Sequence, residues 1–136
     1  MNILLINHYA GSPRHGMEFR PYYLAREWVR QGHRVTIVAS SVSHLRQHNP
    51  EPSAGVAREN IDGVDYVWLR TRPYAGNGAK RLLNMLQFTA KVRGMAHELA
   101  AMRPDVVIAS STYPYDIWPA AKIARVASAR LVFEVR

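Results

Sequence analysis

The chain has 136 residues, of which 48% are hydrophobic, so it suits one domain with a buried core and argues against disorder. It contains no cysteine, which excludes disulfide frameworks, thiol nucleophiles and thiolate metal sites. The net charge of +8 suits phosphate-bearing ligands, anionic membranes or nucleic acid, but the basic residues are scattered and no nucleic-acid-binding motif accompanies them, so we expect no nucleic-acid partner.

The first part of the sequence predicts a strand, a long loop, a helix and a second strand. Residues 2–7 are a short apolar run ended by loop residues, which is typical of a buried strand. A helix is expected to begin near Pro21 and to end before Gly32, because Pro suits a first helical turn and Gly a helix stop. Residues 34–39 are rich in β-branched side chains and predict a strand, which completes a βαβ unit.

The middle of the sequence is more polar. Residues 40–60 contain prolines and show no sustained period, so we expect an exposed excursion. Asp62 and Gly63 predict a turn between short strands, the second of which is residues 64–69. Residues 72–78 predict another loop.

The last part predicts two helices and two strands. One long helix is expected over residues 79–103, because apolar residues recur there at spacings of three and four. Residues 105–109 predict a strand, residues 114–127 a helix and residues 131–135 the last strand. The expected buried stripe of the long helix consists of Met85, Phe88, Val92, Met95, Leu99 and Met102.

This order of elements predicts an α/β fold with a Rossmann-like, doubly wound and mainly parallel sheet. A parallel strand needs cover on both faces, and no helix follows the last strand before Arg136. We therefore expect a domain cut short, or the first part of a longer protein.

The loop after the first strand, residues 7–21, is expected at the sheet edge where α/β folds bind ligands. Gly11 and Gly16 have the separation of a Walker A loop, but Met17 and Glu18 stand where that motif needs Lys and Ser or Thr. A G-x-G-x-x-G fingerprint is also absent. The loop suits a phosphate held by backbone N–H groups and a helix dipole, or a sugar packed against the backbone.

A plainer interpretation of the same loop stays open. Its glycines would only satisfy positive φ angles. In that case Arg14 and Arg20 would be solvated, and His8 and His15 would take no part in binding.

The two ends of the chain resemble family 4 glycosyltransferases of the GT-B type. The family's amino-terminal segment is similar to residues 1–40, which read MNILLINHYAGSPRHGMEFRPYYLAREWVRQGHRVTIVAS. Both have a first strand, a Gly-containing loop, a helix ending in Gly-His and a V-T-V-type strand. Residues 130–136, RLVFEVR, resemble the strand that runs on into an Asp-Leu-Trp-Pro-type segment in the capsule and O-antigen branch.

The resemblance covers residues 1–136 as the acceptor-side Rossmann-like domain. It implies a metal-independent, retaining transfer of a sugar from a nucleotide-sugar to an acceptor in surface polysaccharide synthesis. It also implies that a carboxyl-terminal domain with an E-x7-E motif, absent from this chain, holds most of the donor. We therefore expect no cofactor, no metal and no activity from this chain alone.

By position, the resemblance implies acceptor or donor-phosphate contacts in two loops at one sheet edge. The residues are His8, Gly11, Ser12, His15, Gly16 and Arg20 in the first loop, and Ser110, Ser111, Thr112 and Tyr113 in the second. The fold class also predicts that these loops meet, because both follow parallel strands. Alternatively, the second loop is a hydroxyl-rich lead-in that caps the helix at Ile117.

Glu134 and Arg136 end the last strand and are the candidate catalytic residues. A buried acid needs a partner, and Arg136 lies two residues on and on the same side, so a structural ion pair explains the pair as well as a catalytic one. Many family members carry His at the end of this strand. Arg136 in its place favours a charge-stabilising role over a general base.

The start of the long helix carries apolar residues outside its buried stripe, with cations beside them. The residues are Lys80, Arg81, Leu82, Leu83 and Leu86. Such a surface could dock on an anionic bilayer that carries lipid-linked acceptors, unless residues 40–60 or a further domain cover it. The sequence contains no signal-like segment and no apolar run of the roughly 20 residues that span a membrane. We expect a cytoplasmic protein, placed by this contact at the inner face of the membrane.

A hypothesis of a different class competes with the enzyme. The chain would be a stand-alone flavodoxin-like or nucleotide-binding domain that acts as a regulator or scaffold, with no transfer chemistry.

Overall fold

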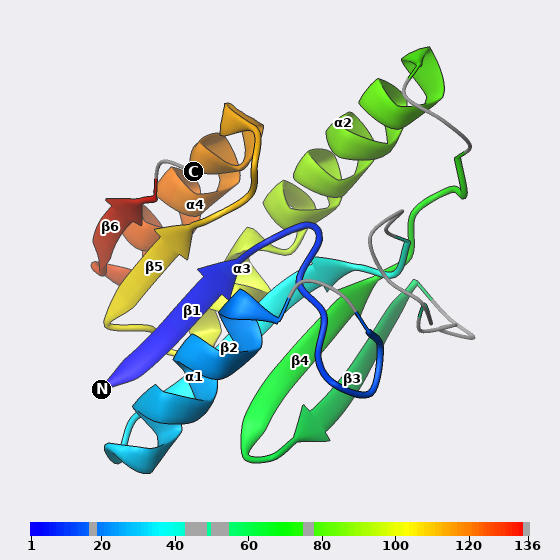
Figure 1. Ribbon diagram of the computed structural model, residues 1–136. Helices are drawn as coiled ribbons and strands as arrows, with labels where there is room; N and C mark the ends of the chain where they lie inside the picture. The colour runs from blue at the N-terminus through cyan, green and yellow to red at the C-terminus, as the bar shows by residue number, and fades with distance from the viewer. Residues whose placement is uncertain (17–18, 43–48, 50–54, 75–77, 135–136) are drawn as a thin grey trace.

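The computed structural model describes residues 1–16, 19–42, 49, 55–74 and 78–134. Within these ranges one sheet has the strand order β3-β4-β2-β1-β5-β6 (Figure 1). The strands are β1 (Asn2–Ile6), β2 (Arg34–Ser40), β3 (Val56–Ile61), β4 (Val64–Leu69), β5 (Val106–Ala109) and β6 (Arg130–Phe133). The helices are α1 (Arg20–Arg30), α2 (Ala79–Gly94), α3 (Ala96–Ala101), α4 (Ile117–Ala127) and the 3₁₀ turn η1 (Pro114–Asp116).

Strand β1 lies between β2 and β5 and is parallel to both. Leu4 of β1 pairs with Thr36 on one side and with Val107 on the other. The pairs β2–β4 and β5–β6 are also parallel, whereas β3 is antiparallel to β4. Because strand side chains alternate, Leu4 and its neighbour Leu5 enter cores on opposite faces of the sheet.

Helices cover both faces of the sheet (Figure 1). On one face, Phe88 of α2, Leu99 of α3 and Ile123 of α4 belong to one buried cluster with the strands. On the other face, Tyr22 of α1 packs in a cluster that includes Trp68 of β4. The predicted doubly wound, mainly parallel sheet is therefore confirmed.

The predicted turn at Asp62 and Gly63 joins β3 to β4. Their φ angles are 53° and 88°, and positive values at both positions are what a type I′ hairpin requires. A Cβ atom added at Gly63 would lie 3.1 Å from Val29 Cγ1 of α1, so this turn also sets the close approach of the hairpin to the helix.

The exposed excursion expected over residues 40–60 ends in a strand, where the sequence indicated only that a short strand precedes the Asp62-Gly63 turn. Val56–Ile61 is strand β3, whose side chains alternate between exposed and half-buried up to a buried Ile61. Its polar alternation does not stand out in the sequence, because an edge strand buries little. Residues 43–48 and 50–54 of the same stretch lie outside the described residues.

The single helix expected over residues 79–103 is also wrong, because it is broken into α2 and α3 at Met95. This residue has φ −96° and ψ 9°, and its N–H is shared between the carbonyls of Lys91 and Val92, both at 3.1 Å. Gly94 directly precedes it, and glycine has a low helix propensity. The expected stripe still faces one core except at Met85, because Phe88, Val92 and Leu99 lie in one cluster with Met95 and Met102 packed against it.

Strand β6 is the uncovered edge of the sheet. The side chains of Leu131, Val132 and Phe133 are all exposed. The lack of cover that the sequence indicates is therefore seen among the described residues, and a further domain that covers this strand stays a prediction.

Candidate functional site

The segments that follow β1, β5 and β6 lie at one edge of the sheet. Ile6 is in register with Ala109, and Ala109 is in register with Phe133. Because the three strands are parallel, their carboxyl ends bring the first loop, the second loop and Glu134 together. The structure thus brings these three segments together, as the fold class predicts.

Hydrogen bonds join the first loop to the second. The His8 N–H donates to Ser111 Oγ at 3.0 Å, and Asn7 Nδ2 donates to Ser110 O at 3.0 Å. His8 Nδ1 lies 2.5 Å from the Tyr113 hydroxyl. Burial raises the pKa of Tyr113, so this phenol stays protonated and can donate a hydrogen bond to His8 Nδ1. These five residues are buried and lock the two loops together.

Glu134 lies at the same edge and is held by two partners. The Ser110 hydroxyl donates to Glu134 Oε2 at 2.7 Å, and Arg20 forms an ion pair with Oε1. The Glu134 side chain is 23% exposed and that of Arg20 is 50% exposed, so solvent and ligands reach both. Arg20 is therefore an ion-pair partner of Glu134. The pairing with Arg136 proposed from the sequence lies outside the described residues.

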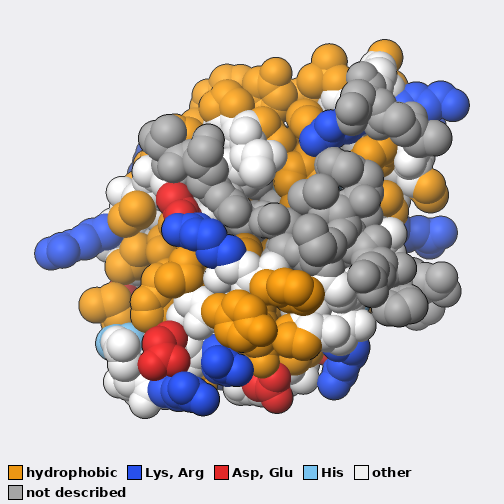
Figure 2. Space-filling model, viewed as in Figure 1, with side chains coloured by type: hydrophobic (Ala, Val, Ile, Leu, Met, Phe, Trp, Pro, Cys, Tyr) orange, Lys and Arg blue, Asp and Glu red, His pale blue; other side chains and the backbone are white. Residues whose placement is uncertain are grey.

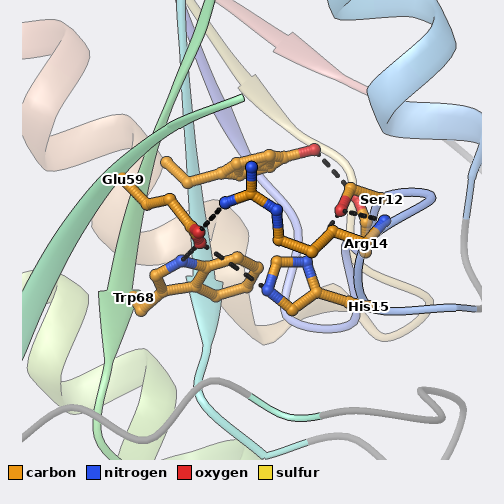
Figure 3. Close-up of polar contacts among 7 residues, drawn as sticks. Ser12, Arg14, His15, Glu59 and Trp68 are labelled. Carbon is orange, nitrogen blue, oxygen red and sulfur yellow. Dashed lines mark hydrogen bonds and ion pairs between the residues drawn. The ribbon is translucent and has the colours of Figure 1, made fainter. Parts of the chain in front are cut away.

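The second half of the first loop turns toward β3 and β4 (Figure 3). Ser12 Oγ lies 2.7 Å from His15 Nδ1, and His15 Nε2 lies 3.6 Å from Glu59 Oε1. Trp68 Nε1 donates to the same oxygen at 3.0 Å, and Arg14 forms an ion pair with Glu59 Oε2. Glu59 therefore anchors this half of the loop through Arg14, His15 and Trp68.

The Ser12, His15 and Glu59 side chains have the composition of a hydrolase triad, but not its accessibility. Ser12 is fully buried and His15 is 5% exposed, so a substrate carbonyl has no route to the Ser12 hydroxyl. The chain of contacts acts instead to fix the loop. The Tyr66 hydroxyl adds a hydrogen bond to Gly11 O at 2.8 Å, and Gly16 has a φ of 88°.

Most residues predicted for the site are buried and shape the loops rather than face solvent. The buried ones are His8, Gly11, Ser12, His15, Gly16, Ser110, Ser111 and Tyr113. Arg20 and Thr112 are exposed and Glu134 is half-buried, so among the predicted residues that the structure describes these three are the ones that a ligand can contact directly.

Two of the plainer interpretations are wrong in detail. Arg14 and Arg20 are not merely solvated, because each pairs with a carboxylate. The second loop does not act as a helix cap, because the residues at the N-cap positions, Tyr113 for η1 and Asp116 for α4, make no side-chain capping hydrogen bond.

Asp116 is a buried residue that sequence reasoning missed. Its Oδ2 accepts the Ser111 N–H at 3.0 Å, whereas Oδ1 has no hydrogen-bond donor among the described residues. Burial raises the pKa of this carboxyl from 3.8 to about 6, despite the opposing hydrogen bond from Ser111. The signal that could have identified Asp116 is an acidic residue close in sequence to the hydroxyl-rich second loop.

The accessible part of the edge carries a guanidinium, a carboxylate and a hydroxyl. Such groups hydrogen-bond sugar hydroxyls, and the guanidinium also binds phosphate oxygens. Within the described ranges, no three His, Cys, Asp or Glu side chains gather so that they could hold a metal ion. Among the helices seen there, none is long and apolar enough to cross a membrane.

Fold and site together define a Rossmann-like α/β domain with polar loops gathered at the carboxyl ends of parallel strands. Residues 15–136 match the family described as "Glycosyl transferase 4-like domain". This match spans most of the chain, and the chain belongs to that family. A search of curated proteins gives no match.

Two solved structures share the fold. One is described as trehalose-6-phosphate from E. coli bound with UDP-2-fluoro glucose; the TM-score is 0.56, with 9% identity over 99% of this chain and 33% of that one. The other is an alpha,alpha-trehalose-phosphate synthase (UDP-forming) from Burkholderia vietnamiensis; the TM-score is 0.50, with 10% identity over 98% of this chain and 32% of that one. The chain thus spans about a third of the solved chains it matches, and the GT-B-type domain fold expected from the sequence is confirmed.

The raised pKa of Asp116 predicts a stability that depends on pH. The folded chain binds this proton more tightly than the unfolded chain, so the free energy of unfolding falls as the pH rises from about 4 to about 6. Asp116→Asn keeps an oxygen for the Ser111 N–H but removes the buried charge. We expect it to raise the free energy of unfolding by about 1–3 kcal/mol at pH 7 and to change it little at pH 4. Urea denaturation at both pH values measures this.

The matched control is Glu98→Gln, which neutralises an exposed carboxyl on α3. Its effect should stay within about 0.5 kcal/mol at both pH values. A destabilised Asp116→Asn variant at pH 7 would contradict the assignment of a buried, unfavourable charge.

Proposed function

We propose that this chain is the amino-terminal, acceptor-side domain of a retaining glycosyltransferase that builds a bacterial surface polysaccharide of the capsule or O-antigen type. The family match over residues 15–136 carries the proposal. A structure of the same fold bound with UDP-2-fluoro glucose supports a nucleotide-sugar as donor. The donor would be held mainly by a carboxyl-terminal domain.

In this proposal the exposed edge of the sheet receives the acceptor. Glu134 is oriented by Ser110 and partly neutralised by Arg20, so this carboxylate can accept hydrogen bonds from acceptor hydroxyls without being left as an unpaired charge. Arg20, with Arg136, would supply positive charge to the departing diphosphate in place of a metal. The buried residues of both loops act as positioning residues, because they fix the backbone that carries the accessible groups.

A transfer assay tests the proposal directly. A longer protein that continues into a donor-binding domain should transfer sugar from a nucleotide-sugar, and the 136-residue chain should not. Release of nucleoside diphosphate, measured over a panel of nucleotide-sugars, reports both. Turnover by the 136-residue chain would show that the donor site is misplaced. No transfer by the longer protein would favour the regulator or scaffold.

Arg20 is the accessible cation of the proposed site within the described part of the chain. Arg20→Gln should lower kcat/KM for the acceptor about ten-fold in the longer protein, because it removes a charged hydrogen-bond donor and frees Glu134. Arg30→Gln, at the other end of α1 and paired with Glu27, is the matched control and should stay within about two-fold. Equal effects of the two substitutions would remove Arg20 from the site.

We also propose that the first turns of α2 contact an anionic membrane. Leu82, Leu83 and Leu86 are 44%, 64% and 42% exposed, and Lys80 is exposed beside them. Figure 2 shows hydrophobic side chains next to basic ones at the upper right, where α2 lies. Arg81 is half-buried with its guanidinium over the Tyr9 ring, so Lys80 is the more accessible cation. The contact would place the enzyme on the cytoplasmic face, near lipid-linked acceptors.

Vesicle co-sedimentation tests this contact. Leu82→Ser with Leu83→Ser should at least halve the fraction that sediments with phosphatidylglycerol vesicles, because it removes exposed apolar area. Val126→Ser, at an apolar residue of similar exposure on α4, should leave sedimentation unchanged. Sedimentation that survives the double substitution would eliminate the membrane contact.

A further inference from the structure

A hollow of about 530 Å³ lies between the first turns of α2 and the segment that follows β4. This volume falls within the range of small-molecule sites. Its lining residues are Arg72, Pro73, Lys80, Leu83, Asn84 and Gln87. A second hollow of about 320 Å³ shares Arg72, Pro73 and Gln87 with it, so the two adjoin the same segment.

The charged groups that line the hollow favour binding of an anion. Among the described residues, its lining contains Arg72 and Lys80 but no Asp or Glu. Both cations are exposed, and neither has an ion-pair partner in the part of the chain that the structure describes. The N-terminus of α2 adds to the positive potential, because its N-cap Gly78 offers no side-chain cap and its first turn carries no acid.

Buried hydrogen bonds hold the hollow in shape. Asn84 is 2% exposed, and its Nδ2 donates to Thr71 Oγ1 at 2.9 Å and to Arg72 O at 2.7 Å. On the other side of the same backbone, the Arg72 N–H donates to Gln87 Oε1 at 2.8 Å. The backbone of Arg72 is thus fixed from both sides by α2, which limits the ordering that a ligand would have to impose.

The wall of the hollow also offers groups that a bare phosphate does not use. A phosphate dianion brings only hydrogen-bond acceptors, whereas a sugar ring also has an apolar C–H face. Leu83 and Pro73 provide apolar surface for the C–H face of a sugar ring.

We propose that this hollow binds a phosphorylated sugar, with the phosphate on Arg72 and Lys80 and the sugar ring against Leu83 and Pro73. It rests on the proposed function in that this ligand would be the acceptor, or the sugar phosphate part of a lipid-linked acceptor. The exposed Leu82 and Leu86 lie on the same helix as the hollow, which suits the lipid-linked form.

Calorimetric titration of the longer protein with glucose 1-phosphate tests the proposal. Inorganic phosphate and glucose are titrated separately. Glucose 1-phosphate should bind more tightly than inorganic phosphate, and glucose should bind weakest. Arg72→Gln with Lys80→Gln should weaken glucose 1-phosphate binding at least ten-fold. The control, Arg93→Gln with Arg125→Gln, makes the same charge change at exposed residues outside the hollow and should change binding less than two-fold.

Either of two results would overturn the proposal: equal weakening by the test and control pairs, or phosphate binding as tight as that of glucose 1-phosphate. Sedimentation with phosphatidylcholine vesicles, with and without phosphatidylinositol, separates the two sources. If the ligand is lipid-borne, the test pair should lose the phosphatidylinositol-dependent fraction; if it is free, only the titration should change.

The titration requires no turnover, so it separates this proposal from the proposed function. Suppose that glucose 1-phosphate binding depends on Arg72 and Lys80 but the protein transfers no sugar. This result would contradict the proposed function and support the hollow as a binding site. Sugar transfer without glucose 1-phosphate binding would contradict the proposed binding site but not the proposed function.

Discussion

The parallel pairing of β1 with β2 and with β5 is the constraint on which the rest of the structure depends. A central parallel strand needs cover on both faces, and β1 has it from α1 on one side and from α2, α3 and α4 on the other. The same pairing sends the carboxyl ends of β1, β5 and β6 to one edge. The polar residues that follow these strands therefore meet there, whatever ligand the edge receives.

Two acids, Glu59 and Asp116, hold the polar loops in different ways. Glu59 is bound by Arg14, His15 and Trp68, so its charge is well satisfied and anchors the first loop to β3 and β4. Asp116 accepts the Ser111 N–H with one oxygen and buries the other without a donor in the described chain. Burial of the Asp116 carboxyl opposes its ionisation, whereas its hydrogen bond with Ser111 holds the second loop. Buried groups with a shifted pKa are often found where proteins arrange functional groups.

The positive charge of the chain serves different purposes at different places. Arg14 and Arg20 are consumed by ion pairs that position the first loop and Glu134. Around the start of α2, Arg72 and Lys80 face a hollow whose described lining contains no acid, beside exposed leucines. An acceptor with a phosphate and a lipid would match both features at once. The sheet edge and the α2 surface would then contact different parts of one ligand.

The sequence by itself determined the strands other than β3, the doubly wound class and the family, because apolar runs, the helix stop at Gly32 and the Asp62-Gly63 turn are local signals. It also indicated which loops would converge, since that follows from parallel strands. Only the tertiary structure decided that β3 pairs at the edge, that the long helix breaks at Met95, and that Glu134 pairs with Arg20. Those outcomes depend on contacts between residues far apart in the chain, and no local pattern specifies them.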